Sequence, residues 1–230
     1  KMQKSSIELY VDSISQPARA TMAFCEFNKI PVDLKKLRIF KGDTFSEEFR
    51  KINPSGLLPF LKEGDFSLIE SHAIMRYLAA TQKVDDHWYP SDPKIRAKVD
   101  EYLDWHHLNT RTAANYLRGL NNIPGMGGAI TYDPERERKV LDNALNLIET
   151  ELLSKNEFLA TNGKPSIADL SAACELIQLE LASFDFGKYP KIGRWMCKLF
   201  QMEPMQKVHK EFFVMVARAK EKAKPKPKLQ

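Results

Sequence analysis

A short segment near the N-terminus combines residue types and spacing that could stabilise an anion. Ile7, Leu9 and Val11 alternate as on a half-buried strand. Pro17 then suits the first turn of a helix, because its missing N–H would be unpaired there anyway. Ser15 lies between the two, where free N–H groups and the positive end of the helix dipole favour an anion. Its hydroxyl could donate a hydrogen bond to a ligand thiolate, or it could simply cap the helix.

The elements that position this hydroxyl alternate up to about residue 81. Apolar alternation and turn residues predict strands and helices in turn, followed by a hairpin and a last helix. After the first strand and helix, the expected elements are a strand at Val32–Leu37, a helix at Ser46–Ile52, a strand entered at Leu58, a strand at Phe66–Ile69 and a helix that Ser71 caps. The order βαβ followed by ββα implies an α/β domain with a mixed four-stranded sheet.

From about residue 90 the pattern is helical throughout. Helices are expected after Pro93 and Pro134, and further ones near the C-terminus. The segment from Ser166 to Asp169 has the spacing of a capping box, with Asp in place of the usual Glu or Gln. We therefore expect a domain over 1–81, a linker over 82–91, an all-α domain over 92–217 with a loop at 121–131, and a tail over 218–230.

The charge of the chain is concentrated at its end. The formal net charge is +5, and residues 218–230 alone hold six basic residues against one acidic residue. This Lys/Pro-rich tail has almost no apolar residues and is expected to be disordered. The neutral remainder gives no sign of nucleic-acid binding, and without a run of about 18 apolar residues no membrane span is expected. Cys25, Cys174 and Cys197 lie far apart in expected helices, which indicates buried, reduced thiols in a cytoplasmic protein.

Several motifs occur in an order that resembles the cytosolic glutathione transferases. The family-wide motifs are Asn53-Pro54, Leu58-Pro59, Glu70-Ser71 and Ser166–Asp169. Those that most closely resemble the theta class are Ser15-Gln16-Pro17, Asp65-Phe66, Trp88-Tyr89-Pro90 and Asp100-Glu101-Tyr102-Leu103. The resemblance covers nearly the whole chain apart from the tail. It implies a thioredoxin-like N-terminal domain followed by an all-helical C-terminal domain.

The resemblance also implies that the N-terminal domain binds glutathione. A cis bond at Leu58-Pro59 would turn the N–H and C=O of Leu58 outward, where they could pair with the cysteinyl unit as an added strand. Otherwise Pro59 would be a trans proline that starts a strand. Ser71 would donate to the γ-glutamyl carboxylate at a helix start, and Glu70 would pair with the ligand's ammonium group. Ser71 would also suffice as a plain helix cap.

Ser15 would then lie beside the glutathione sulfur. As a hydrogen-bond donor it would stabilise the thiolate and lower the thiol pKa from about 8.5. Ser13 and Tyr10 are alternative donors, and Tyr10 ranks last because it lies inside the strand pattern. The resemblance to theta enzymes places Arg111, on the long helix of the second domain, near the sulfur as a supporting cation. A solvent-exposed arginine is the alternative.

The remaining expected glutathione contacts are Gln16, Lys41, Thr44 and Leu57. Two of them depart from the family pattern, because Leu57 stands where members often carry Lys, and Thr44 stands where theta enzymes often carry His. Loss of one charge-assisted contact to the glycyl carboxylate would cost about 1.5–3 kcal/mol. We therefore expect weak glutathione binding, unless another basic group such as Lys41 holds that carboxylate.

The activity implied by the resemblance is transfer of glutathione to small electrophiles, such as alkyl or aryl halides and epoxides, with some peroxidase activity. Ile14, Tyr116 and Phe212 are expected to line the apolar pocket for the second substrate. A homodimer is expected, with no metal, nucleic-acid or membrane partner. His106 and His107 are adjacent on a helix, so they point about 100° apart and cannot jointly bind an ion. The alternatives are a non-catalytic interaction module of the same fold and a carrier of apolar ligands.

Overall fold

The N-terminal domain contains the expected mixed sheet. The computed structural model describes residues 6–120 and 132–223, so the loop expected over 121–131 lies outside the described residues. The strands are β1 (Ile7–Val11), β2 (Val32–Lys36), β3 (Phe60–Glu63) and β4 (Phe66–Ile69), in the spatial order β2-β1-β3-β4. β1 pairs with β2 in parallel and with β3 antiparallel, and β3 pairs with β4 antiparallel. The predicted fold class is confirmed for this domain.

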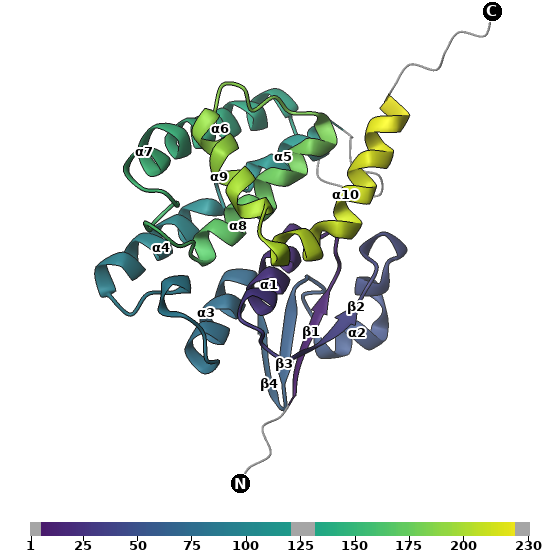
Figure 1. Ribbon diagram of the computed structural model, residues 1–230. Helices are drawn as coiled ribbons and strands as arrows, with labels where there is room; N and C mark the ends of the chain where they lie inside the picture. The colour runs from purple at the N-terminus through teal and green to yellow at the C-terminus, as the bar shows by residue number, and fades with distance from the viewer. Residues whose placement is uncertain (1–5, 121–131, 224–230) are drawn as a thin grey trace, which may run out of the picture.

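The helical domain lies against one side of the sheet domain (Figure 1). The helices of the sheet domain are α1 (Gln16–Phe27), α2 (Glu47–Ile52) and α3 (Ser71–Thr81). Those that follow are α4 (Pro93–His106), α5 (Thr112–Gly119), α6 (Pro134–Leu147), α7 (Leu153–Lys155), α8 (Ile167–Leu176), α9 (Pro190–Phe200) and α10 (Glu203–Ala223). The all-helical character predicted for the second domain is therefore confirmed.

Both faces of the sheet are covered. α1 and α3 pack together on one face, where Leu9 of β1 and Leu61 of β3 are fully buried. α2 covers the other face through Phe49, whose ring centroid lies 5.7 Å from that of Tyr10 and 6.2 Å from that of Phe60. The alternation along β1 thus directs one set of side chains to α1 and the next set to α2.

α8 is the central helix of the second domain. All of its residues are buried, and it packs against α1, α3, α4 and α5. The predicted capping box is confirmed, because the Ser166 N–H donates to the Asp169 carboxylate at 2.8 Å. The same carboxylate accepts from the Leu159 N–H and from Trp195 Nε1–H, each at 2.9 Å. These donors compensate the cost of burying the Asp169 charge.

The long helix expected before Arg111 is broken. α4 ends at His106 and α5 begins at Thr112, which makes Arg111 the N-cap residue of α5. Asn109 donates its side-chain amide to the Trp105 carbonyl at 2.9 Å, so a side chain takes the place of a helical backbone donor. The prediction of one continuous helix here was wrong. The spacing of apolar residues does not show that a side-chain donor competes with the helical backbone bonds.

The basic tail begins later than expected. α10 is 21 residues long and continues to Ala223, whereas disorder was expected from residue 218. Phe212 and Val216 are buried and dock this helix on the core, and the Ala, Lys and Glu residues that follow are good helix formers. Residues 224–230 lie outside the described residues. Over the ranges that the structure describes, no helix combines the length and apolar character needed to cross a membrane.

The expected linker over 82–91 is anchored to the sheet domain. It contains a 3-10 turn at Asp86–Trp88. The Trp88 ring packs on Phe24 and Phe27 of α1, with centroids 5.8 Å and 4.9 Å away. This buried ring connects the end of the sheet domain to the start of α4.

The three cysteines are unpaired, but they differ in exposure. Cys25 and Cys174 are buried, as expected, and burial raises the pKa of each thiol to about 12. Cys197 is exposed, which corrects the prediction that all three thiols are buried. The reason is that α9 buries Trp195 and Met196 on one side and turns Cys197 to the solvent.

Candidate functional site

Ser15 lies at the N-terminus of α1, where the sequence places it. It is the N-cap residue, and its Oγ accepts from the Ala18 N–H at 3.4 Å. Its hydroxyl donates to the Leu58 carbonyl, also at 3.4 Å, and the residue is 7% exposed. Both distances are long for hydrogen bonds of a hydroxyl. The Ser15 hydroxyl can therefore exchange the Leu58 carbonyl for a stronger acceptor.

The Leu58–Pro59 peptide bond is cis, which confirms the prediction. The loop before it is held by the buried Asn53, whose side-chain amide donates to the Leu57 carbonyl at 2.9 Å. Among the described residues, no acceptor pairs with the Leu58 N–H. Leu58 thus presents a backbone donor and acceptor close to the Ser15 hydroxyl.

Glu70 and Ser71 lie at the junction of β4 and α3. Ser71 is the first residue of α3, and Glu70 is its N-cap, which corrects the expected capping role of Ser71. The backbone of Glu70 has φ 70° and ψ 112°, a conformation that non-glycine residues rarely adopt. Strained conformations of this kind cluster at binding sites. The turn exposes the Glu70 side chain and leaves the Ser71 N–H among the unpaired donors of a helix start.

These segments meet in a cleft of about 240 Å³ between the two domains. Six of the eight expected glutathione contacts line it: Gln16, Leu57, Leu58, Pro59, Glu70 and Ser71. Arg111 and Glu175 reach the same cleft from the helical domain. The structure therefore brings together residues that lie far apart in the sequence.

Two expected contacts, Lys41 and Thr44, lie outside this cleft. Lys41 is exposed at the end of a short 3-10 turn, and Thr44 is buried in the next one. An ion pair of 2.9 Å between Arg38 and Asp43 closes this loop on itself. Thr44 is 4% exposed and does not line the cleft, so its role as a glutathione contact stays a prediction. Leu57, 61% exposed at the rim, offers no charge in its place.

Of the residues expected to line the electrophile pocket, Phe212 was predicted wrongly. It is 1% exposed, and the Arg19 guanidinium lies 4.1 Å from its ring centroid. Phe212 therefore belongs to the core and not to an open pocket. Ile14 and Tyr116 are half-buried. The guanidinium carbon of Arg138 in α6 lies 5.7 Å from the centroid of the Tyr116 ring. Their role in a pocket stays a prediction.

Sequence reasoning missed Arg19, which holds the loop before Ser15. Its guanidinium is fully buried and donates to the carbonyls of Ser13 at 2.9 Å and Ile14 at 2.8 Å. It also donates to the Cys174 carbonyl of α8 at 3.2 Å. Burial lowers the pKa of Arg19 to about 10. The signal that could have found it is an arginine between two alanines on the apolar side of α1.

Glu175 was also missed, and it joins the two sides of the cleft. Its carboxylate is 1% exposed and accepts from Gln16 Nε2 at 2.8 Å and from Arg111 Nη1 at 3.0 Å. The Gln178 amide donates to it as well, and His106 Nε2 lies 3.9 Å away. Burial raises the pKa of Glu175 to about 7, although the Arg111 guanidinium opposes this shift. Arg111 is therefore a paired cation rather than a free one.

Three histidine rings pack together where α3 of the sheet domain meets the end of α4 in the helical domain. The ring centroid of His72 lies 5.2 Å from that of His106 and 4.8 Å from that of His107. His72 Nε2 lies 2.6 Å from the Ser171 hydroxyl. Burial lowers the pKa of His72 to about 3 and that of His106 well below its usual value. Within 6–120 and 132–223, no group of three His, Cys, Asp or Glu side chains is arranged to hold a metal ion.

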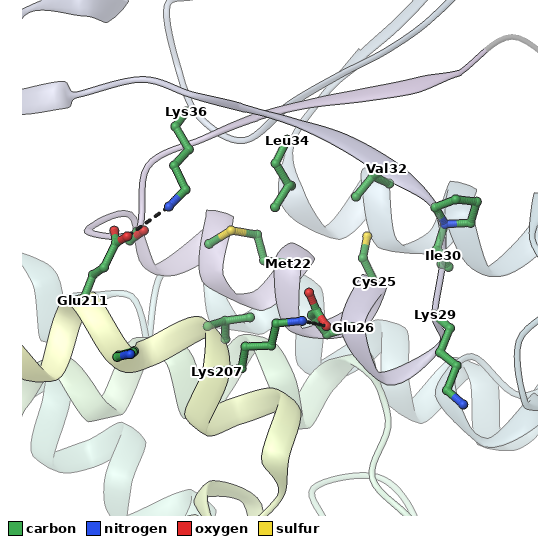
Figure 2. A pocket seen from close by; sticks show the side chains of 14 residues that line it. Met22, Cys25, Glu26, Lys29, Ile30, Val32, Leu34, Lys36, Lys207 and Glu211 are labelled. Atoms are coloured by element: carbon green, nitrogen blue, oxygen red, sulfur yellow. Dashed lines mark hydrogen bonds and ion pairs between the residues drawn. The ribbon is translucent and has the colours of Figure 1, made fainter.

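A larger cleft of about 520 Å³ lies between α1, β2 and α10. Figure 2 shows side chains of α1 and β2 facing one another across it. The ion pairs Lys36–Glu211, at 2.9 Å, and Lys207–Glu26, at 2.7 Å, join its α10 wall to the sheet domain. None of the eight expected glutathione contacts lines this cleft, so size alone does not identify the candidate site.

Comparison with known proteins identifies the family. Residues 15–81 match the family model for the glutathione S-transferase N-terminal domain, and residues 131–203 match the model for the C-terminal domain. Glutathione S-transferase theta-2 of Homo sapiens is 36% identical, over 96% of this chain and 93% of its own. A crystal structure of human glutathione transferase theta-2, in complex with glutathione and an unknown ligand, has a TM-score of 0.83 at 34% identity. That alignment covers 96% of this chain and 93% of the other.

A second solved structure agrees with the first. The theta-class human enzyme in complex with the glutathione conjugate of 1-menaphthyl sulfate has a TM-score of 0.82 at 36% identity, over 96% of this chain and 93% of that one. The sheet domain and the helical domain are therefore those of a glutathione transferase, and the chain belongs to that family. Within the family it is a theta-class member, as its motifs predicted.

Proposed function

We propose that this chain binds reduced glutathione in the interdomain cleft and that Ser15 stabilises its thiolate. One observation carries the proposal: the Ser15 hydroxyl lies 3.4 Å from the carbonyl of Leu58, the residue before the cis-proline. If the N–H and C=O of Leu58 pair with the cysteinyl unit as an added strand, the ligand sulfur comes next to this hydroxyl.

The chemistry asked of Ser15 is modest. A free thiol with a pKa of about 8.5 is only a few per cent thiolate at pH 7. A hydroxyl donor and the free N–H groups at the start of α1 favour the charged sulfur, and each unit by which they lower the thiol pKa corresponds to about 1.4 kcal/mol. Ser15 keeps its proton throughout. The thiol proton is released to solvent, and the thiolate then forms a C–S bond with an electrophilic carbon. In a halide the carbon–halogen bond breaks and the halide leaves with the electron pair. In an epoxide one C–O bond breaks, and the oxygen stays on the product and takes a proton from water.

The start of α3 offers groups that match the γ-glutamyl end of the ligand. The Ser71 hydroxyl and N–H at the start of α3 suit the γ-glutamyl carboxylate. The exposed Glu70 carboxylate suits the ammonium group. The glycyl carboxylate has no cationic side chain at the position of Leu57, so we propose that glutathione binds weakly.

We extend the proposal to the second substrates, the location, the oligomeric state and the domain limits of the chain. Small halides and epoxides are the proposed second substrates, with some peroxidase activity and a role in detoxification. We also propose a cytoplasmic homodimer with the domain limits 1–81, 82–91 and 92–217. These proposals rest on the resemblance to theta-class glutathione transferases, to which the human relatives of the chain belong by name.

Conjugation of glutathione to a panel of alkyl halides and epoxides tests the function. The wild-type chain should conjugate at least one of them, and Ser15→Ala should lower kcat about 100-fold, as loss of a donor to a reacting anion does. Ser13→Ala is the matched control and should retain activity. Near wild-type turnover by Ser15→Ala, or loss in Ser13→Ala alone, would show that Ser15 was assigned wrongly.

A further inference from the structure

Glu175 places a carboxylate where stability alone would favour an apolar residue. It lies in α8, whose residues are all buried. Burying a carboxylate costs several kcal/mol, and a buried ion pair is often no more stabilising than well-packed apolar side chains of the same size. Besides Gln178, the side-chain donors that compensate this cost lie at the N-termini of two helices that flank the cleft. The arrangement therefore has a use other than stability.

The first of these donors is Gln16, which follows Ser15 directly and begins α1. Its buried side chain gives Nε2 to Glu175 at 2.8 Å. Because the Gln16 side-chain nitrogen donates to Glu175, the amide oxygen is the atom that can accept a hydrogen bond from a ligand in the cleft, which Gln16 lines. Without the carboxylate, the amide could rotate, and the bond from Arg19 to the Cys174 carbonyl would remain to join the first turn of α1 to α8.

The second donor is Arg111, the N-cap residue of α5. Its side chain is 32% exposed, and a long side chain at such a place has many rotamers. The bond of 3.0 Å from Nη1 to the Glu175 carboxylate selects the one that reaches the cleft. The same carboxylate thus sets the direction of a side chain from each domain.

We propose that Glu175 is a positioning residue that fixes the side chains of Gln16 and Arg111 on opposite sides of the candidate glutathione cleft. The inference rests on the proposed transferase function. It differs from that function in assigning a role to a residue that need not touch either substrate.

Glu175→Gln is the direct test, because it keeps the size of the side chain and removes the charged acceptor. It should lower kcat about tenfold, as expected for misplaced supporting groups. In an Arg111→Met background the same change should have a smaller effect, because one of the two side chains that it positions is already gone. Glu180→Gln, a charge removal at a surface ion pair with Lys220, is the matched control and should keep wild-type kcat. An unchanged kcat in Glu175→Gln, or an equal loss in both backgrounds, would overturn the proposal.

Two further measurements keep the outcome decisive. If Glu175→Gln fails to fold, Glu175→Asp is the second variant, because it keeps the charge on a shorter side chain. A kcat below that of the wild type would support the positioning role, and a wild-type kcat would overturn the proposal. If the wild-type chain conjugates no electrophile, the proposed function fails. Calorimetric titration with S-methylglutathione then decides on Glu175 itself. A loss of affinity of about tenfold in Glu175→Gln, absent in Glu180→Gln, supports positioning, and equal affinities contradict it.

Discussion

The Ser15 hydroxyl oxygen lies 3.4 Å from the Leu58 carbonyl oxygen, although 43 positions separate the two residues. The contact joins the start of α1 to the loop that carries the cis-proline. Ser15 does not itself line the cleft, but its neighbour Gln16 and its partner Leu58 do, so the contact places a side-chain donor and a helix N-terminus beside the open backbone N–H of Leu58. The proposed role of Ser15 depends on this contact.

Leu57→Lys should tighten glutathione binding. Leu57 is 61% exposed at the rim of the cleft, where an ammonium group could reach the glycyl carboxylate. One charge-assisted hydrogen bond is worth about 1.5–3 kcal/mol, or roughly a 10- to 100-fold lower Kd. Calorimetric titration with glutathione measures the change. Leu147→Lys, at an exposed leucine of α6, is the control for added charge, and equal gains in both variants would contradict the explanation.

Asp169→Ala should destabilise the helical domain by about 3–5 kcal/mol. The change leaves buried donors of Ser166, Leu159 and Trp195 without their acceptor, and each costs about 1–3 kcal/mol when unpaired. Urea unfolding at equilibrium measures the loss. Asp133→Ala removes an exposed N-cap of α6 and should cost only about 1 kcal/mol. Equal losses would mean that Asp169 acts as a simple cap.

Arg19→Lys should destabilise the chain by about 2–3 kcal/mol despite keeping the charge. An ammonium group cannot match the planar fork that serves the Ser13, Ile14 and Cys174 carbonyls, and carbonyls left unpaired in the interior are costly. Arg194→Lys, at an exposed position of α9, should be neutral. The expected result is a lower urea midpoint in Arg19→Lys and an unchanged midpoint in Arg194→Lys. An unchanged midpoint in Arg19→Lys would contradict a stabilising role for the bonds from Arg19 to the three carbonyls.

Acid should destabilise the chain in part through His209. Burial, helped by the positive Arg19, lowers the pKa of His209 from 6.5 to about 3. Between pH 6.5 and pH 3 the His209 ring binds a proton in the unfolded chain but not in the folded chain. The free energy of unfolding therefore decreases as the pH falls from about 6.5 toward 3. At pH 5 the loss amounts to about 2 kcal/mol.

His209→Phe should remove that dependence, because the ring lies among Phe200, Phe212 and Phe213 and an apolar ring fits there. Urea unfolding at pH 7.5 and pH 5 gives the comparison, with the wild-type chain losing about 2 kcal/mol more than the variant. The same pH slope in both proteins would exclude His209 as the source.

Much of the fold follows from local patterns. The alternation in β1, the turn before β4 and the capping box at Ser166 each specify an element without reference to the rest of the chain. Pro59 is different, because its cis bond was expected from the family resemblance and not from spacing. The capping role of Ser71 was misjudged by one residue, since Glu70 adopts a positive φ that residue type does not suggest.

The parts of the site that sequence reasoning missed depend on contacts between distant segments. Glu175 reads as one polar position in an apolar helix, and only its bonds to Gln16 and Arg111 give it a place in the cleft. Phe212 reads as a pocket residue until Arg19 is found to lie against its ring. Periodicity predicts which face of a helix is buried, but it does not predict which buried partner lies opposite.

Titration of the bound glutathione thiol measures the effect of the Ser15 hydroxyl on the thiolate itself. The ultraviolet absorbance of the thiolate, followed against pH at saturating glutathione, gives the thiol pKa in the wild-type chain and in Ser15→Ala. The account predicts a wild-type value well below the free value of about 8.5, and a return toward that value by about one unit or more in Ser15→Ala. The same low pKa in both proteins would contradict the role of Ser15.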